Sequence, residues 1–176
     1  MVTKLYIPVN NLGPFLTAKK ISNIDIHAKT GIPTVELSQL RSGDIETIRA
    51  NKLFLIAKVG KIDIKDMLLG VYPELRLNSA EDIKFDFQSI SDFFNYVQKD
   101  VIQMIADKTG LAVYRIKKIK ANKVNPAAHE LYLIELATKT KPGTLFNILF
   151  KDLQLNSSEE EANLRLLEKK KSRKTS

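Results

Sequence analysis

The sequence contains no cysteine and only two histidines among its 176 residues. Without cysteine it can form no disulfide, no thiolate metal site and no cysteine nucleophile. It also lacks a G-x-x-x-x-G-K phosphate loop, a G-x-G-x-x-G dinucleotide motif, an H-E-x-x-H zinc motif and a plausible Ser–His–Asp spacing. We therefore expect a protein that is not an enzyme and that holds no cofactor and no metal.

Long apolar runs are also missing. No stretch approaches the ~18 apolar residues that a membrane span requires. The opening residues MVTKLYIPVNN show neither a long apolar run nor a small-residue cleavage pattern, which argues against a signal peptide. The hydrophobic fraction of 44% is sufficient for one core or two small ones. We expect a soluble cytoplasmic protein with no membrane partner.

Acidic residues are outnumbered: 28 Lys and Arg stand against 20 Asp and Glu, a formal net charge of +8. Such a balance favours an anionic partner without identifying it. The basic residues concentrate in TGLAVYRIKKIKANK, residues 109–123, which contains no acidic residue. A surface of one sign repels itself unless a polyanion binds there.

This basic stretch predicts a turn followed by a short helix. Gly110 supplies the left-handed turn conformation, and Asn122 is suited to end the helix. Helical spacing places Leu111, Ile116 and Ile119 on a buried face. The opposite, exposed face then carries Tyr114, Arg115, Lys117, Lys118 and Lys120.

The same pattern occurs earlier in the chain. Residues 30–43, TGIPTVELSQLRSG, repeat the turn glycine and the apolar spacing of the basic stretch. Downstream, residues 53–77 align without a gap on residues 131–155, and their apolar positions agree nearly throughout. We interpret this agreement as an internal duplication.

The repeat divides the chain into five parts, and everything legible in them is helical. These are an N-terminal arm (1–19), a first unit (20–77), an acidic linker (78–90), a second unit (91–155) and a C-terminal helix with a basic tail (156–176). The first unit is predicted to contain helices over about 22–29, 34–41, 48–59 and 65–69. A long helix from Ser89 or Ser91 to about Lys108 opens the second unit, with Phe94, Val97, Val101 and Ile105 on its apolar face.

Several local features carry further expectations. Leu5 to Val9 suggests an edge strand or extended arm, followed by a turn at Gly13-Pro14. Ser158 and Glu161 suggest a capping box that begins the last helix, and residues 168–176 are expected to be disordered. His27 is expected to be packed and neutral, and His129 to lie on a helix surface. Ile24 and Ile26 are expected to be core residues.

The spacing resembles the phage-repressor-type (XRE-like) helix-turn-helix family. In that family a small residue precedes the turn glycine by four, apolar residues follow it by six and nine, and a Gly or Asn follows by twelve. The second unit shows this as Ala106, Gly110, Ile116, Ile119 and Asn122. The first unit shows it as His27, Gly31, Leu37, Leu40 and Gly43. The resemblance implies an all-α protein with two tandem repressor-like units.

The resemblance also implies which residues meet DNA. The helices near 34–41 and 113–120 become recognition helices lying in the major groove. Family positions for reading bases fall on Thr34, Val35 and Gln39, and on Val113, Tyr114 and Lys118. Neighbouring positions that touch phosphate fall on Glu36, Ser38 and Arg41, and on Arg115, Lys117, Lys120 and Lys123. Glu36 is an unsuitable phosphate neighbour because of its charge.

One further family position fastens the preceding helix to phosphate. The family usually has a glutamine or a similar polar residue there. In the first unit the position is Asn23, whose amide is an acceptable substitute. In the second unit it is Ile102, whose apolar side chain cannot bind phosphate. We therefore expect the two units to differ. The second should provide most of the electrostatic attraction to DNA, and the first should add sequence discrimination or serve partly as a packing partner.

The resulting interpretation is sequence-specific binding to double-stranded DNA by a transcriptional regulator of a phage, plasmid or similar element. Two units in one chain form an intramolecular pseudo-dimer, or the chain forms a homodimer through its first unit. The alternative is a protein–protein adaptor or antitoxin-like partner protein on the same fold. RNA is disfavoured, because the narrow groove of A-form RNA does not admit such a helix.

Overall fold

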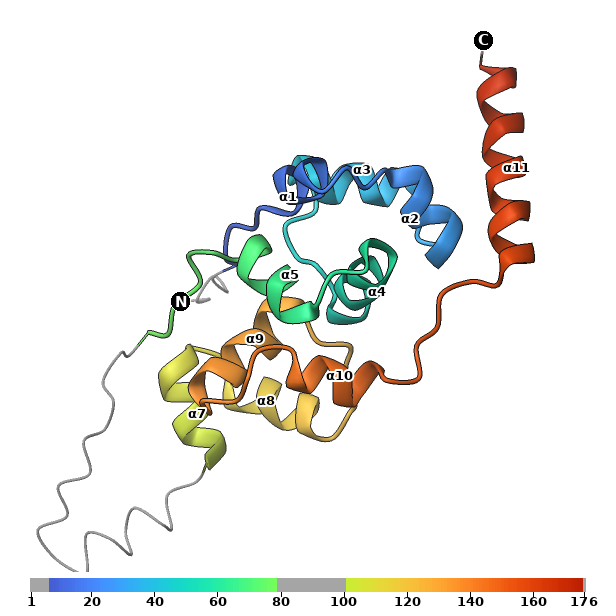
Figure 1. Cartoon of the computed structure of the whole chain (residues 1–176). Helices are drawn as coiled ribbons and strands as arrows, with labels where there is room; N and C mark the ends of the chain where they lie inside the picture. The colour runs from blue at the N-terminus through green and yellow to red at the C-terminus, as the bar shows by residue number, and fades with distance from the viewer. Residues whose placement is uncertain (1–6, 79–100, 176) are drawn as a thin grey trace, which may run out of the picture.

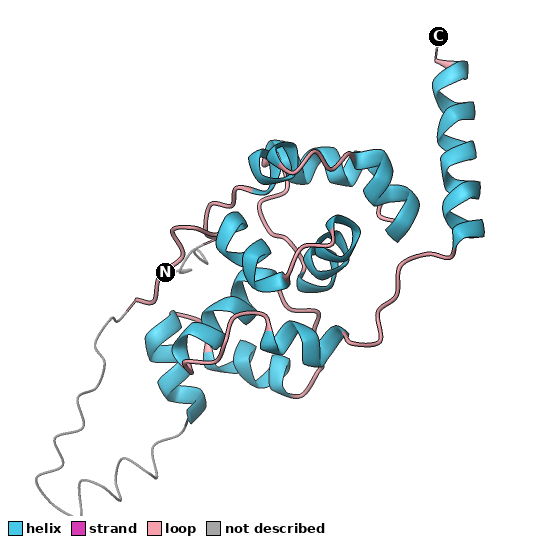
Figure 2. Ribbon diagram, viewed as in Figure 1, coloured by secondary structure: helices cyan, strands magenta, loops and turns pink. Residues whose placement is uncertain are grey.

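The computed structural model describes residues 7–78 and 101–175, and within these ranges it is helical with no β-strand (Figures 1 and 2). The first half contains α1 (Leu12–Ala18), α2 (Asn23–Thr30), α3 (Thr34–Ser42), α4 (Ala50–Gly60) and α5 (Ile64–Val71). The second half contains α7 (Val101–Thr109), α8 (Val113–Lys120), α9 (Ala128–Ala137), α10 (Thr144–Phe150) and α11 (Ser158–Lys174). The all-α prediction is confirmed, and no helix in the described ranges is long and apolar enough to cross a membrane.

The turns that join α2 to α3 and α7 to α8 have the same local structure. Gly31 and Gly110 adopt left-handed φ angles of 78° and 74°. Each donates its N–H to the carbonyl four residues before it, at 2.8 Å in both cases. Thr30 and Thr109 each accept the N–H two residues ahead at 3.1 Å and donate their hydroxyl to the carbonyl four residues back. Both turns therefore direct the second helix away from the first in the same way.

The two halves pack on each other through equivalent helices. α4 packs on α9, and one short antiparallel bridge joins Arg49 to Ala127. The Ala50 amide donates to the Pro126 carbonyl at 2.9 Å, and the Ala128 amide to the Ile48 carbonyl at 2.8 Å. Positions 48 and 126, and 50 and 128, are separated by the same 78 residues as 53 and 131. The contact is therefore the same on both sides, as in an isologous dimer interface.

The chain that follows each half crosses to the other half. The Asn78 amide donates to the Lys108 carbonyl at the end of α7, at 2.8 Å. The Asn156 amide donates in the same way to the Lys29 carbonyl at the end of α2, at 2.7 Å. Together with the α4–α9 contact, this exchange makes a single hydrophobic core from both halves.

The N-terminal segment differs from the prediction. Residues 12–18 form helix α1, where we expected an arm with a turn at Gly13-Pro14. The Asn10 side chain accepts the Leu12 N–H at 3.2 Å, and Leu12 and Leu16 are fully buried as α1 packs on α3 and α5. Gly13 is needed here because a Cβ would lie 2.3 Å from the Arg41 carbonyl oxygen. The first half therefore has an opening helix that the sequence analysis missed; Leu5 lies outside the described residues.

The last helix also differs. Its cap is Ser157 with Glu160, one residue before the predicted pair Ser158 and Glu161, and the helix continues to Lys174 through the segment expected to be disordered. The helix packs on α2.

Three further predictions concern core residues. Ile26 is fully buried, but Ile24 is 52% exposed because it lies on the outer side of α2; Ala28 takes the second core position. Ile105 is buried on α7, whereas Val101 at its start is 58% exposed. Phe94, Val97, both proposed helix starts at Ser89 and Ser91, and all of the predicted linker except Asn78 lie outside the described residues.

Candidate nucleic-acid interface

Helix α8 buries one face and exposes a cationic one. Ile116 and Leu111 are 4% and 7% exposed and fix the helix on the core. On the opposite side Tyr114 is 61% exposed, and the Lys118 ammonium lies 5.6 Å from the centre of its ring. The other exposed cations of this surface are Lys117, Lys120 and, after the helix, Lys123. Val113 is half-buried at the first position of the helix.

Arg115 is the exception on this helix, because it is bound inside the protein. Its guanidinium donates two hydrogen bonds to the Glu130 carboxylate, at 2.7 and 2.8 Å. Glu130 lies at the start of α9, is 4% exposed and also accepts the Ala127 amide at 2.8 Å. Burial works to raise the pKa of Glu130, but the bonds from Arg115 and Ala127 outweigh it and lower the pKa. Arg115 therefore holds α8 on α9, and its predicted contact with phosphate stays a prediction.

Helix α3 presents a face of a different kind. Val35 is 68% exposed, Ser38 and Gln39 are exposed, and Thr34 is half-buried. These side chains are uncharged, and hydroxyl, amide and methyl groups of this kind suit contacts with base edges.

Both charged side chains of α3 are engaged within the protein. Glu36 forms an ion pair with Lys52 of α4, so it does not stand as an unpaired negative charge on this surface. Arg41 donates to the Ile21 carbonyl and is half-buried, and desolvation lowers its pKa. Arg41 therefore fixes α3 against the segment before α2, and its predicted contact with phosphate stays a prediction.

Asn23 lies at the first position of α2 and reaches α3. Its side-chain amide donates to the Ser38 hydroxyl at 3.2 Å. Both residues, with Arg41 and Gly13, line an open hollow of about 820 Å³ on the α1–α3 surface. The counterpart in the second half, Ile102, is partly buried against the core and offers no polar group there.

The two histidines have different surroundings. His27 Nδ1 lies 2.8 Å from the Ile32 carbonyl, and Nε2 lies 3.7 Å from Glu168 of α11, so this residue is packed as expected. His129 is only 6% exposed and packs edge-on against Tyr72 at 6.4 Å, so its predicted surface position was wrong. His129 is the second residue of α9 and is buried where the two halves pack on each other, a contact that the sequence does not reveal. Among the described residues no cluster of three or more His, Asp or Glu side chains could hold a metal.

The two exposed helix faces lie on the outside of the molecule. In Figure 1, α3 is on the upper side and α8 on the lower side, with α4, α5, α9 and α10 between them. The paired α4 and α9 therefore determine how the two faces are separated and oriented.

Comparison with known proteins finds no matching family model, no matching curated protein and no matching solved structure. The resemblance to repressor-type helix-turn-helix proteins thus remains a prediction that rests on the residues named above.

Proposed function

We propose that this protein binds double-stranded DNA and acts as a transcriptional regulator, with α8 and α3 as its recognition helices. The observation that carries the proposal is the exposed face of α8, which presents Lys117, Lys118 and Lys120 beside Tyr114. The sequence of this stretch, residues 109–123, contains no acidic residue. Lysine ammonium groups on one helix face bind phosphates and release counterions, which gives affinity with a strong salt dependence.

The two helices have unequal roles in this proposal. α8 provides most of the phosphate contacts, and Lys118 and Tyr114 reach base edges. α3, with Thr34, Val35, Ser38 and Gln39 on its outer side, adds sequence discrimination. Asn23, held on Ser38, directs the start of α2 toward phosphate, and the helix dipole there favours a negative group.

The equivalent packing of α4 and α9 supports an intramolecular pseudo-dimer over a homodimer. One chain already contains two copies of the proposed reading helix related by the same contact on both sides. A single chain would then cover two half-sites of one DNA duplex.

A fluorescence anisotropy titration tests the proposal. Random 30-base-pair duplex DNA is titrated at low and at physiological salt, beside single-stranded RNA of equal length. We expect micromolar or tighter binding to the duplex at low salt that weakens steeply as salt rises. Absence of duplex binding at low salt would reject the proposal.

A second candidate function is a protein–protein adaptor, and one observation favours it. Ile148 and Leu149, adjacent on α10, are 61% and 38% exposed, and Leu149 lines a hollow together with Asn122 and Lys123 just past α8. Adjacent exposed apolar side chains suit a protein partner. If the duplex does not bind, binding assays should turn to this surface.

A further inference from the structure

Helix α11 ends the chain but lies on the first half of the molecule. It packs on α2, and the crossing segment before it places Asn156 at the end of that helix. The Asn156 amide donates to Lys29 at 2.7 Å, and its side chain donates to the Ala28 carbonyl at 3.0 Å. The segment that leads into α11 is therefore attached to α2 by one hydrogen bond from the backbone of Asn156 and one from its side chain.

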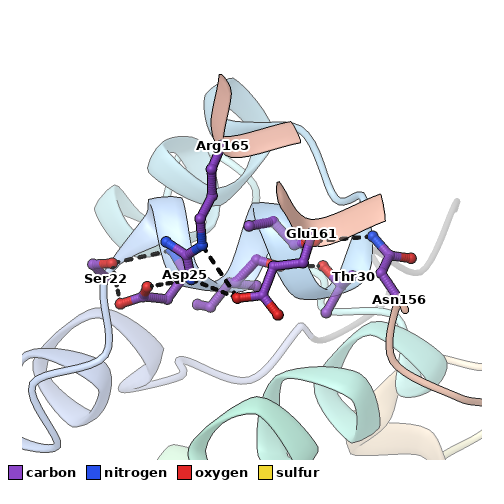
Figure 3. Close-up of polar contacts among 8 residues, drawn as sticks. Ser22, Asp25, Thr30, Asn156, Glu161 and Arg165 are labelled. Atoms are coloured by element: carbon purple, nitrogen blue, oxygen red, sulfur yellow. Dashed lines mark hydrogen bonds and ion pairs between the residues drawn. The ribbon is translucent and has the colours of Figure 1, made fainter. Parts of the chain in front are cut away.

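Charged groups attach the middle of α11 to the same helix (Figure 3). Arg165 donates to Asp25 of α2 at 2.9 Å and to Glu161 at 2.8 Å. The Ser22 hydroxyl and Arg165 lower the pKa of Asp25, so this carboxylate is charged at neutral pH. Glu168 lies 3.7 Å from His27, one turn further along α11.

The C-terminal half of α11, here residues 168–174, begins at the Glu168 contact with His27 and continues beyond it. In Figure 1 it extends past α1, α2 and α3. All of its cations are exposed: Lys169, Lys170, Lys171, Arg173 and Lys174. The other acidic residues of α11 lie at its start, where Glu160 completes the cap and Glu161 binds Arg165. Glu168 lies within this half and binds Lys171 at 3.1 Å.

The reading helix of the first half, α3, exposes no cation of its own. Neither charged residue of α3 is available, because Glu36 is paired with Lys52 and Arg41 is bound to Ile21. α8, by contrast, exposes its own lysines. α11 thus brings five basic residues, of which Lys171 is paired with Glu168, to the half whose reading helix has no exposed cation.

We propose that the C-terminal half of α11 is a phosphate-contacting element for the first half. It binds the DNA backbone beside the segment that α3 reads. This inference rests on the proposed function, which it extends by adding a third contact surface.

The composition of this half of α11 supports a polyanion over other partners. Residues 168–175 contain no apolar side chain, whereas a helix that lies on a membrane or in a protein groove needs an apolar face. At 3.6 residues per turn the five cations cover an arc of about 200° around the helix, a broad face that can meet several phosphates.

Charge-matched variants test the inference. The α11 variant carries Lys170→Gln, Arg173→Gln and Lys174→Gln, and the control carries Lys61→Gln, Lys141→Gln and Lys151→Gln at exposed positions elsewhere. Both lower the net charge of +8 by three, and circular dichroism checks that glutamine preserves the helix. The readout is the slope of log K against log salt for the 30-base-pair duplex.

We expect the α11 variant to lose about two to three units of slope, since each phosphate contact contributes about 0.9, and the control to lose less than one unit. An equal loss in both variants would assign the effect to overall charge and overturn the inference. An unchanged slope in the α11 variant, with normal binding by the unmodified protein, would also overturn it while leaving the proposed function intact. Failure of the unmodified protein to bind duplex would instead reject the proposed function.

Proximity supplies a second measurement that does not depend on affinity. The chain has no cysteine, so Thr175→Cys or Ala162→Cys introduces the only thiol, to which an iron chelate can be attached. On bound duplex, hydroxyl radicals should cut DNA from position 175 and much less from position 162, which lies in the attached half of α11. Equal cleavage from both positions, or none from 175, would contradict the proposal.

Discussion

Arg115 and Glu130 form a two-bond ion pair, at 2.7 and 2.8 Å, that joins α8 to the start of α9. The Glu130 side chain is 5% exposed and that of Arg115 is 22% exposed. The most basic helix of the protein is thus oriented by a buried carboxylate fifteen residues downstream.

Replacement of Arg115 tests this pair. Arg115→Ala leaves Glu130 buried with only the Ala127 amide as partner, and breaking a buried pair costs about 3–5 kcal/mol. Because Arg115 is partly solvated, we expect the free energy of unfolding to fall by about 2–3 kcal/mol in urea titration. Arg115→Lys keeps the charge but loses the two-bond geometry and should lose less. A loss under about 0.5 kcal/mol for Arg115→Ala would mean that the pair does not hold α8.

The exposed lysines of α8 should act on DNA and not on stability. Lys117→Ala with Lys118→Ala is expected to reduce the salt slope of duplex binding by about one to two units. The melting temperature should stay nearly constant, because both side chains are exposed. Lys141→Ala with Lys151→Ala removes the same charge elsewhere and serves as the control. If the slope does not change in the α8 variant, this helix is outside the interface.

Gln39 on α3 is predicted to carry sequence information. Gln39→Ala should relax the preference for a selected DNA site over random DNA without abolishing binding, since a good pair of side-chain contacts to a base discriminates by about 1–3 kcal/mol. Competition titrations with both DNAs measure the preference. An equal loss on every sequence would show that Gln39 contributes affinity only.

His129 should make stability depend on pH. Burial lowers its pKa from 6.5. Below that value the unfolded chain binds a proton that the folded chain does not, so the free energy of unfolding falls as pH decreases from about 6.5 toward the folded pKa. The slope for one group is at most about 1.4 kcal/mol per pH unit.

The control variant is His129→Asn. Asparagine is chosen because Asn51 occupies the equivalent position in the first half. Urea unfolding of both proteins between pH 7.5 and 5.5 measures the effect. The free energy of unfolding of the original protein, relative to this variant, should decrease as pH decreases. Burial also raises the pKa of Glu135, but this residue is present in both proteins, so its contribution to the difference cancels. A pH-independent difference would mean that His129 is not desolvated.

The helices from α2 to α5 could be predicted from local patterns, because each has its own signals. Ser22 and Asp63 accept amide hydrogen bonds at the starts of α2 and α5, and Gly31 and Gly43 end α2 and α3 in left-handed conformations. Such signals act within a few residues and can therefore be recognised in the sequence.

Features that depend on distant partners could not be predicted. α1 is ordered because Leu12 and Leu16 fill space between α3 and α5. The last helix was predicted from its local cap, but its packing on α2, where Arg165 binds Asp25, was not. The same limit applies to the proposed site: the sequence identifies Arg41 and Arg115 as cations, but only packing engages them with Ile21 and Glu130.

The sequence by itself determined the helical class, the internal duplication and the two turn glycines, since period, spacing and backbone preference are local properties. The tertiary structure alone decided that the halves pack through α4 and α9, that the segments at Asn78 and Asn156 cross over, and which cations remain exposed. Those outcomes depend on which surfaces bury each other, and burial is set by contacts between residues far apart in the chain.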